Sequence, residues 1–373
     1  MKNTVFITGA GKSEYFTQVI AAIGGRIVNR KTINRHSFTG LKQAFFHLSK
    51  DEVDDLSDFY RKVKAEKAPS IVYRKILDIR ARLYFSRYYT FFSTIDEQYF
   101  SIWNGYYLAD KALVLAGEKH GKTPIYFENG LLPNTTTVDA KGINYANSLP
   151  RTPEFYRQLS VPADFSSGCE LVVRPLAKGK QEVESVVLPK RYVFVPFQVE
   201  TDTQILVYGG WVKNMRHLYA QLQAVVAGLD DKELVFVIKE HPTSLERYDD
   251  LQLEKNPRLI FANGNNTQDL IADAEAVITI NSTVGIEALM LQKKVISLGQ
   301  AFYTIEGIVQ HAGSQQALLD VIRQLPAWSP DAELVRKFIN YLQEQYLVKG
   351  SWRTPAAQHF QALREKLQAI TGQ

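Results

Sequence analysis

The sequence predicts an α/β protein built from two Rossmann-like domains, each with a parallel sheet. The first indication is its length of 373 residues, which exceeds one ordinary hydrophobic core and suits two domains of about 150 to 200 residues. The second is the alternation of short β-rich runs with helical segments, which is typical of a parallel sheet covered on both faces. The third is an interruption of this alternation at 150–190, where five prolines and a charged run occur.

The first half of the chain supplies the elements of one such domain. Glycines at 9, 24 and 25 end its first strand and helix, and Gly130 and Pro133 bend the chain after a later strand. The segment 51–115 has few Gly or Pro residues, so we expect it to be mostly helical. The expected elements are a strand at 4–8, a helix at 17–23, a strand at 26–28, the helical segment at 51–115 and a strand at 124–128.

The second half repeats the alternation after a linker, which we place around the charged run at 178–184. The expected strands are at 192–197, 233–239, 258–261, 276–280 and 294–298, and the expected helices are at 214–227, 267–274, 283–291, 331–347 and 354–370. This pattern predicts domains at 1–185 and 186–350. It also predicts a C-terminal helical segment at 351–373 that packs back across a cleft between them.

Composition and charge exclude several classes of protein. The chain is 45% hydrophobic and 22% charged, as soluble globular proteins are. Its net charge of +5 comes without a run of five Lys or Arg residues, so we expect no nucleic-acid partner. Cys169 is the single cysteine and excludes an internal disulfide. Without a signal peptide or a long apolar stretch, we expect a cytoplasmic protein. The positive excess is compatible with an anionic substrate or an anionic membrane surface.

A glycine-rich stretch, GAGKS at 9–13, invites comparison with a phosphate-binding loop. The full pattern needs a glycine five residues before Gly11, and that position holds Phe6. We therefore interpret this stretch as a turn between a strand and a helix.

A second motif, VIKEHPTS at 237–244, follows a buried strand of the second domain. Lys239 and His241 are expected at the carboxyl end of that strand, and Pro242 ends it. Ligands of open α/β sheets bind at this edge. The pair suits a phosphate or the edge of a cytosine-type base, although a histidine satisfied by its own loop explains the motif equally simply.

A third motif, TINSTVGIEALM at 279–290, is more specific. Asn281, Ser282 and Thr283 are expected to cap a helix whose first N–H groups bind phosphate. Glu287 lies one turn further along the same face and can accept both hydroxyls of a ribose. The simpler alternative is a well-capped helix with a surface glutamate.

Carboxylates follow the strands of both domains. Glu128 precedes the Gly-Leu-Leu-Pro turn of FENGLLP at 127–133, where either a tight turn or a working site is expected. Gln198, Glu200 and Asp202 lie in the loop after the first strand of the second domain. One of these acids can act as a nucleophile or base if it faces a sugar, but acids in a loop are more often simply solvated.

Together these motifs resemble one family, the bacterial retaining β-Kdo glycosyltransferases, which build the Kdo linker of capsular polysaccharides or place β-Kdo on O-antigen chains. The resemblance covers most of residues 100–310 in the family's order, and the first hundred residues match weakly. The stretches that carry it are WNG at 103–105, ENGLLPNTTTVDAKGINYANSLPR at 128–151, QVETDTQ at 198–204, KEHP at 239–242, NSTVGIEAL at 281–289 and GQAFY at 299–303.

The resemblance implies a GT-B-like fold, in which two Rossmann-type domains with parallel sheets face a central cleft. Residues 1–185 would bind the acceptor and 186–350 the donor, CMP-Kdo, without a catalytic metal or other cofactor. Retention by two displacements needs a carboxylate beneath the anomeric carbon and a second group that manages protons. Asp202 matches the nucleophile position, and Glu128 matches the carboxylate expected to act as acid or base.

The resemblance also implies a donor site in the second domain. It consists of Lys239, His241 and Pro242 at the CMP phosphate or base, Asn281, Ser282 and Thr283 at the phosphate, Glu287 at the ribose, and Gln198. Cationic and N–H donors can take over the role of a metal because CMP carries a single phosphate. Asp139, Asn144 and Arg151 either fix the loop after Glu128 or touch the Kdo carboxylate.

Two other functions fit the same sequence. A related transferase that uses sialic acid or glycerol phosphate from a CMP or CDP donor would share the nucleotide site. A non-catalytic subunit of capsule export would keep the two domains without the chemistry. The expected partners are a nucleotide-sugar donor and a glycan or glycolipid acceptor, with peripheral association with the inner membrane or with other polysaccharide-assembly modules left open.

Overall fold

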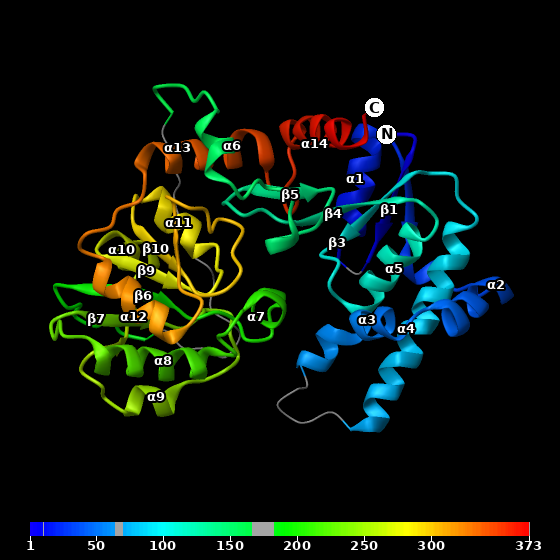
Figure 1. Ribbon diagram of the computed structural model, residues 1–373. Helices are drawn as coiled ribbons and strands as arrows, with labels where there is room; N and C mark the ends of the chain where they lie inside the picture. Colours follow the sequence, from blue (N-terminus) through cyan, green and yellow to red (C-terminus); the bar gives the residue numbers. More distant parts are fainter. Residues whose placement is uncertain (10, 64–69, 166–182, 373) are drawn as a thin grey trace. The chain divides into compact units, whose positions relative to one another are not determined.

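The computed structural model describes residues 1–9, 11–63, 70–165 and 183–372 (Figure 1). The chain forms two compact units. Unit 1 contains Met1–Ser148 and Tyr346–Gln373, and unit 2 contains Leu149–Gln345. The division therefore falls earlier in the chain than the boundary expected at residue 185. Residues 178–182 of the charged run at 178–184, which we interpreted as a linker, lie outside the described residues.

Unit 1 contains a mixed six-stranded sheet with the order β12-β5-β4-β3-β1-β2. Strands β2, β1, β3 and β4 are parallel, and β5 is antiparallel to both β4 and β12. The strands are β1 Thr4–Thr8, β2 Arg26–Asn29, β3 Tyr99–Trp103, β4 Thr123–Asn129, β5 Thr135–Asp139 and β12 Val348–Lys349. The α-helices are α1 Ser13–Ile23, α2 Phe38–Lys42, α3 Lys50–Val63, α4 Ile71–Phe92, α5 Leu108–Glu118 and α14 Ala357–Thr371.

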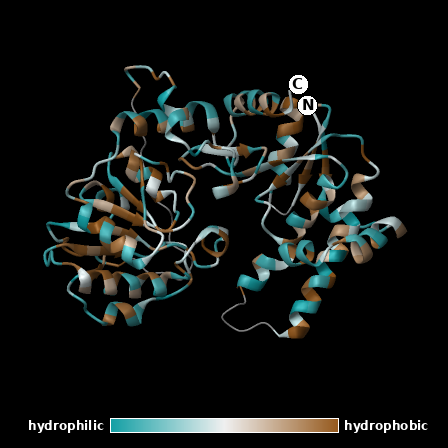
Figure 2. Cartoon of the chain, in the orientation of Figure 1, coloured by the Kyte–Doolittle hydropathy of each residue, from teal (hydrophilic) through white to brown (hydrophobic). Residues whose placement is uncertain are grey.

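Strand β1 shows why this sheet needs helices on both faces. Its five residues are all buried, and successive side chains of a strand point to opposite faces. Val5 and Ile7 pack in one core cluster with α4 and α5, whereas Phe6 packs in another with Phe16 and Leu363. Figure 2 shows the hydrophobic strands of this sheet between helices. The C-terminal helix α14 belongs to this unit, where it contacts β12 and α1.

Unit 2 contains a fully parallel sheet with the order β11-β10-β9-β6-β7-β8. Numbered within the unit, this is the Rossmann order 3-2-1-4-5-6 read from the other edge, and its order reverses between β6 and β9. The strands are β6 Tyr192–Pro196, β7 Val235–Lys239, β8 Leu259–Phe261, β9 Ala276–Thr279, β10 Lys294–Ser297 and β11 Gln310–His311. The α-helices are α6 Pro153–Arg157, α7 Thr203–Tyr208, α8 Met215–Gly228, α9 Asp249–Leu253, α10 Thr267–Ala272, α11 Val284–Met290, α12 Gln315–Gln324 and α13 Ala332–Tyr341.

The expected α/β class with two Rossmann-type units is confirmed, and with it the GT-B-like class at the level of the separate units. The expectation that 51–115 is mostly helical is confirmed by α3, α4 and α5, but β3 also lies inside this segment and pairs with both β1 and β4. Its sequence, YFSIW, is rich in aromatic residues, which favour strands. Among the described residues, no helix is long and apolar enough to cross a membrane.

Candidate active-site residues

The predicted donor residues of unit 2 share one edge of its sheet. Strands β9, β6 and β7 are neighbours and run parallel, so their carboxyl ends meet at the same edge. Gln198 follows β6, Lys239 ends β7 and Asn281 follows β9. The reversal of strand order between β6 and β9 lies at this edge, which is the place where open α/β sheets bind ligands.

Gln198 and Asn281 bridge this reversal through a buried hydrogen-bond network. Gln198 Nε2 donates to Asn281 Oδ1 at 3.0 Å, and Gln198 Oε1 accepts from the Asn281 N–H at 3.2 Å. Asn281 Nδ2 donates to the carbonyl oxygens of Gln204 and Tyr208 in α7. Only 6% of Gln198 and 1% of Asn281 is exposed. Both amides are therefore buried and hold the loops after β6 and β9 together.

The helix after β9 is short, and its first N–H groups are used locally. Ser282 Oγ accepts from the Val284 N–H at 3.2 Å, and the Ser282 N–H donates to Thr279 Oγ1 at 3.0 Å. The N–H groups of Gly285, Ile286 and Glu287 donate to the carbonyls of Ser282 and Thr283. Ser282 is therefore the capping side chain, and Thr283 makes no side-chain cap bond. Glu287 lies in the first turn, half-buried.

The His-Pro turn after β7 orients the imidazole of His241. The Thr243 N–H donates to His241 Nδ1 at 3.2 Å. In the neutral ring this bond assigns the proton to Nε2, which makes Nε2 a hydrogen-bond donor. The Lys239 ammonium donates to the Asn265 carbonyl. Burial lowers the pKa of Lys239. Pro242 is half-buried in the same turn.

The two acids of the loop after β6 have different surroundings. Glu200 Oε1 accepts from the Tyr248 hydroxyl at 2.9 Å and from the Met215 N–H at 3.1 Å, so it ties this loop to α8 and α9. Asp202 is exposed and caps α7, where its Oδ1 accepts from the Gln204 N–H at 2.8 Å. Of these two carboxylates, Asp202 is the one presented to solvent at the carboxyl edge of the sheet.

Glu128 of unit 1 is the penultimate residue of β4 and lies at the carboxyl end of that strand. Asn104 Nδ2 donates to Glu128 Oε2, and the backbone N–H of Asn129 donates to Oε1, both at 2.8 Å. A Cβ atom on Gly130 would lie 1.9 Å from Thr135 Oγ1. A larger residue would therefore force apart the β4–β5 turn that holds Glu128, which explains the glycine of the ENGLLP motif.

Sequence reasoning missed a cation beside Glu128. Lys12 comes from the GAGKS loop after β1, and its Nζ lies 3.9 Å from the ring centroid of Trp103 and 3.1 Å from that of Trp352. Desolvation by burial lowers the pKa of Lys12 to about 8, with Glu128 opposing this shift and Arg353 adding to it. Strand order in unit 1 also reverses between β1 and β3, so Lys12 and Trp103 mark the equivalent ligand edge.

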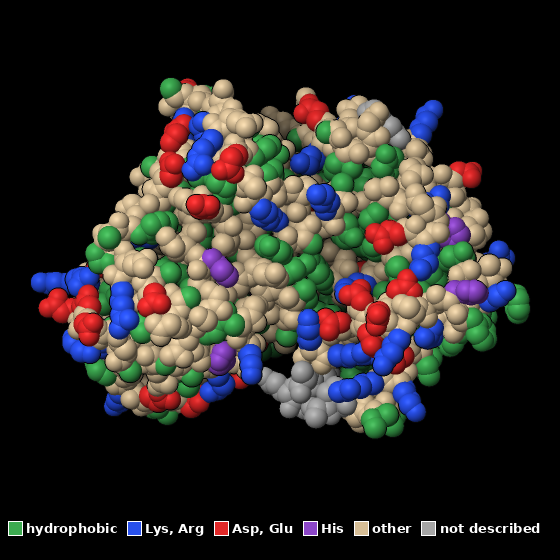
Figure 3. Space-filling view, in the orientation of Figure 1, with side chains coloured by type: hydrophobic (Ala, Val, Ile, Leu, Met, Phe, Trp, Pro, Cys, Tyr) green, Lys and Arg blue, Asp and Glu red, His purple; other side chains and the backbone are tan. Residues whose placement is uncertain are grey.

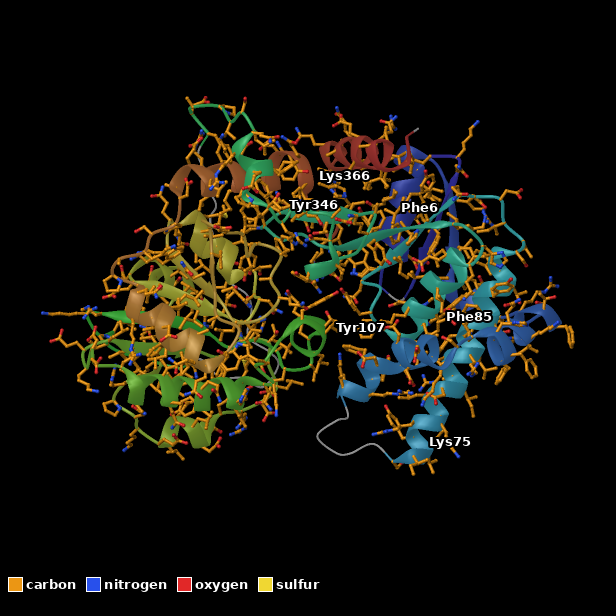
Figure 4. The ribbon with its side chains drawn as sticks, in the orientation of Figure 1. Phe6, Lys75, Phe85, Tyr107, Tyr346 and Lys366 are labelled. Carbon is orange, nitrogen blue, oxygen red and sulfur yellow. The ribbon has the colours of Figure 1, made fainter. Side chains whose placement is uncertain are left out.

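Asp139 has a structural role in unit 1. Its carboxylate is 1% exposed and accepts from the N–H groups of Lys141 and Ser148 and from the hydroxyls of Ser148 and Tyr346. Tyr346 and Lys366, labelled in Figure 4, come from the C-terminal segment that completes this unit. Asp139 therefore fixes the loop after β5, whereas Arg151 belongs to unit 2 and donates to the Leu149 carbonyl at 2.7 Å.

Two curated proteins and one solved structure are similar to this chain. Protein FixF of Sinorhizobium fredii (strain NBRC 101917 / NGR234) is 42% identical over 65% of this chain, and the chain spans 58% of FixF. The capsule polysaccharide export protein KpsS of Escherichia coli is 28% identical over 58% of this chain and 69% of its own length. The Thermosulfurimonas dismutans KpsC β-Kdo 2,4 transferase is 14% identical over 93% of this chain and 92% of that structure, with a TM-score of 0.49.

The family described as "Capsule polysaccharide biosynthesis protein" matches residues 177–352. This range contains the loop of Asp202, the His-Pro turn and the Asn-Ser-Thr segment, which together form the ligand edge of unit 2. Over these residues the chain is similar to the capsule polysaccharide biosynthesis family.

Proposed function

We propose that this chain is a glycosyltransferase that moves Kdo from CMP-Kdo to a bacterial surface glycan or glycolipid, with net retention and without a catalytic metal. The observation that carries this proposal is the shared edge of β6, β7 and β9, where Asp202, His241 and Ser282 follow neighbouring strands. The match of the same residues to a capsule polysaccharide biosynthesis family supports it. The motif resemblance supplies the choice of Kdo.

The donor would bind at the edge of unit 2. We assign the phosphate or base of CMP to His241 Nε2, which the bond from the Thr243 N–H leaves as a donor. Thr283 and Glu287 remain assigned to the phosphate and the ribose. Gln198 and Asn281 support this site by fixing the loops that carry Asp202 and Ser282.

Two carboxylates would perform the chemistry. We assign Asp202 as the nucleophile that attacks the anomeric carbon as CMP leaves, forming a Kdo ester on its carboxylate. The acceptor hydroxyl then displaces that ester, and its proton passes to Glu128. The hydrogen bond from Asn104 orients the carboxylate of Glu128. The ammonium of Lys12 lies against the indole rings of Trp103 and Trp352, and it suits an anionic group on the acceptor.

The direct test is incubation of the chain with CMP-Kdo generated in situ and a small panel of acceptors, followed by NMR of the product linkage. Mass spectrometry of the intact protein should detect a Kdo adduct that Asp202→Asn lacks. Turnover of a sialic acid or glycerol phosphate donor, but not of Kdo, would replace the proposed donor with the related transferase activity. Failure to bind CMP at all would instead favour a non-catalytic export subunit.

A further inference from the structure

Exposed hydrophobic side chains gather on one part of unit 1. Of the 17 large hydrophobic side chains that are exposed among the described residues, nine lie on α2, on the π-helical turn Gln43–His47 that follows it, and on α4. We call this set the α2–α4 face. Its members are Phe38, Leu41, Phe45, Phe46, Ile71, Val72, Ile76, Ile79 and Leu83. Phe38 is 85% exposed and Phe46 82%. Figure 2 shows these hydrophobic segments on α2 and at the N-terminal end of α4.

Helix α4 is apolar on two opposite sides. One side, which includes Leu77, Phe85 and Tyr88, is buried in the core of unit 1. At about 100° per residue, Val72, Ile76, Ile79 and Leu83 form a row on the other side. A helix of a globular protein normally needs only one apolar side. The second row therefore has no partner within the described part of unit 1 that covers it.

The same row continues as Ser86 and Thr90, and α2 covers it there. The Ser37 N–H donates to Thr90 Oγ1 at 3.0 Å, and a Cβ atom on Gly40 would lie 2.5 Å from Thr90 Oγ1. In the polar half of the row Ser86 is buried and Thr90 is half-buried beneath α2, whereas the apolar half is left in solvent. Globular proteins usually bury apolar side chains and expose polar ones. The reversed order along this row indicates that its apolar half meets a surface outside the chain.

Basic residues outnumber acidic ones in the two segments that carry the α2–α4 face. Residues 30–50 contain five Lys or Arg residues and no Asp or Glu, and residues 71–92 contain five Lys or Arg residues and one acid, Asp78. Asp78 is paired with Arg61 at 2.6 Å. Lys75 lies on the exposed half of α4, away from the buried Phe85 (Figure 4). In Figure 3, hydrophobic side chains lie beside Lys and Arg side chains around α2 and the end of α4.

We propose that the α2–α4 face docks unit 1 on a lipid bilayer that contains anionic lipids. Aromatic and branched apolar side chains next to Lys and Arg are the pattern of helices that lie in a membrane interface. The basic residues would meet lipid phosphates while the apolar row enters the acyl boundary. A second copy of this chain fits less well, because pairing the face with itself would bring two strongly positive surfaces together. This proposal does not depend on which sugar the site transfers.

The test is flotation of the full chain with phosphatidylcholine vesicles that contain or lack phosphatidylglycerol. We expect the wild type to float with anionic vesicles and to be released by salt. The double variant Ile76→Ser/Ile79→Ser should reduce the bound fraction about tenfold, and Lys75→Glu should reduce it less. The matched control is Leu245→Ser/Leu253→Ser, which replaces two side chains of unit 2 that are 83% and 74% exposed. It should float like the wild type.

Circular dichroism should show that all variants are folded, because the replaced side chains are exposed. Failure of the wild type to float with anionic vesicles would overturn the proposal, as would equal loss of binding in the control variant. Size-exclusion chromatography of the wild type and the double variant would detect self-association through this face. A wild-type dimer that Ile76→Ser/Ile79→Ser converts to a monomer would assign the face to self-association instead.

Discussion

The buried amide pair at the edge of unit 2 allows a quantitative test. Replacing Gln198 with Leu keeps a side chain of similar length but removes the partner of the Asn281 side-chain oxygen and of the Asn281 N–H. It also removes the acceptor of the Thr279 hydroxyl at 3.2 Å. Each buried polar group left without a partner costs about 1–3 kcal/mol. With two such groups, we expect Gln198→Leu to lower the free energy of unfolding of unit 2 by about 2–6 kcal/mol.

Urea denaturation followed by circular dichroism would measure this loss, and isothermal titration with CMP would measure its effect on binding. The matched control is Gln316→Leu on α12, since Gln316 is exposed and bonds only to the half-buried Asp320 among the described residues. That control should change stability by no more than about 0.5 kcal/mol. We expect Gln198→Leu also to weaken CMP binding, because the loops of Asp202 and Ser282 lose their common anchor. Wild-type stability together with wild-type CMP affinity in Gln198→Leu would refute the positioning role.

Three further predictions concern charge. Asp202→Asn should abolish transfer while leaving the urea midpoint unchanged, because asparagine caps a helix as well as aspartate does; activity assays and denaturation of the same sample check this. The acceptor KM of the wild type should rise above about pH 8, where Lys12 loses its proton, and Lys12→Arg should remove that rise in a pH series. Burial lowers the pKa of His359 from 6.5, so below about pH 6.5 the unfolded chain binds a proton that the folded chain does not. The free energy of unfolding should therefore fall as the pH drops below this value. Urea midpoints of His359→Gln should fall less over the same pH range.

Much of the candidate site in unit 2 was predictable from the sequence, because each of its residues follows a strand at close range. The runs around 192–197, 233–239 and 276–280 are continuous and apolar, and the polar residues after them can only lie at the carboxyl edge of a parallel sheet. Strand order was not needed for this inference. The individual roles were less predictable. The burial of Gln198 and Asn281 depends on strands β6 and β9 being neighbours, which distance along the chain does not reveal.

The ligand edge of unit 1 was predicted only at Glu128. The pair Asn104-Gly105, with φ angles of 68° and 96°, is a turn signal that would have revealed β3 within 51–115. A strand there would have placed the GAGKS loop beside WNG and so directed attention to Lys12. Trp352 offers no such signal, because it reaches the site from the far end of the chain through the pairing of β12 with β5.

Because its last 28 residues are built into unit 1, the protein cannot be divided into two functional halves by a single cut. Both termini belong to unit 1 (Figure 1), and the sequence of unit 2 is inserted into that of unit 1. A fragment ending at residue 345 would lose an edge strand, the indole beneath Lys12 and a core helix together. Shuffling between related proteins would therefore need two crossover points, one near residue 148 and one near residue 346, to exchange unit 2 without disturbing unit 1.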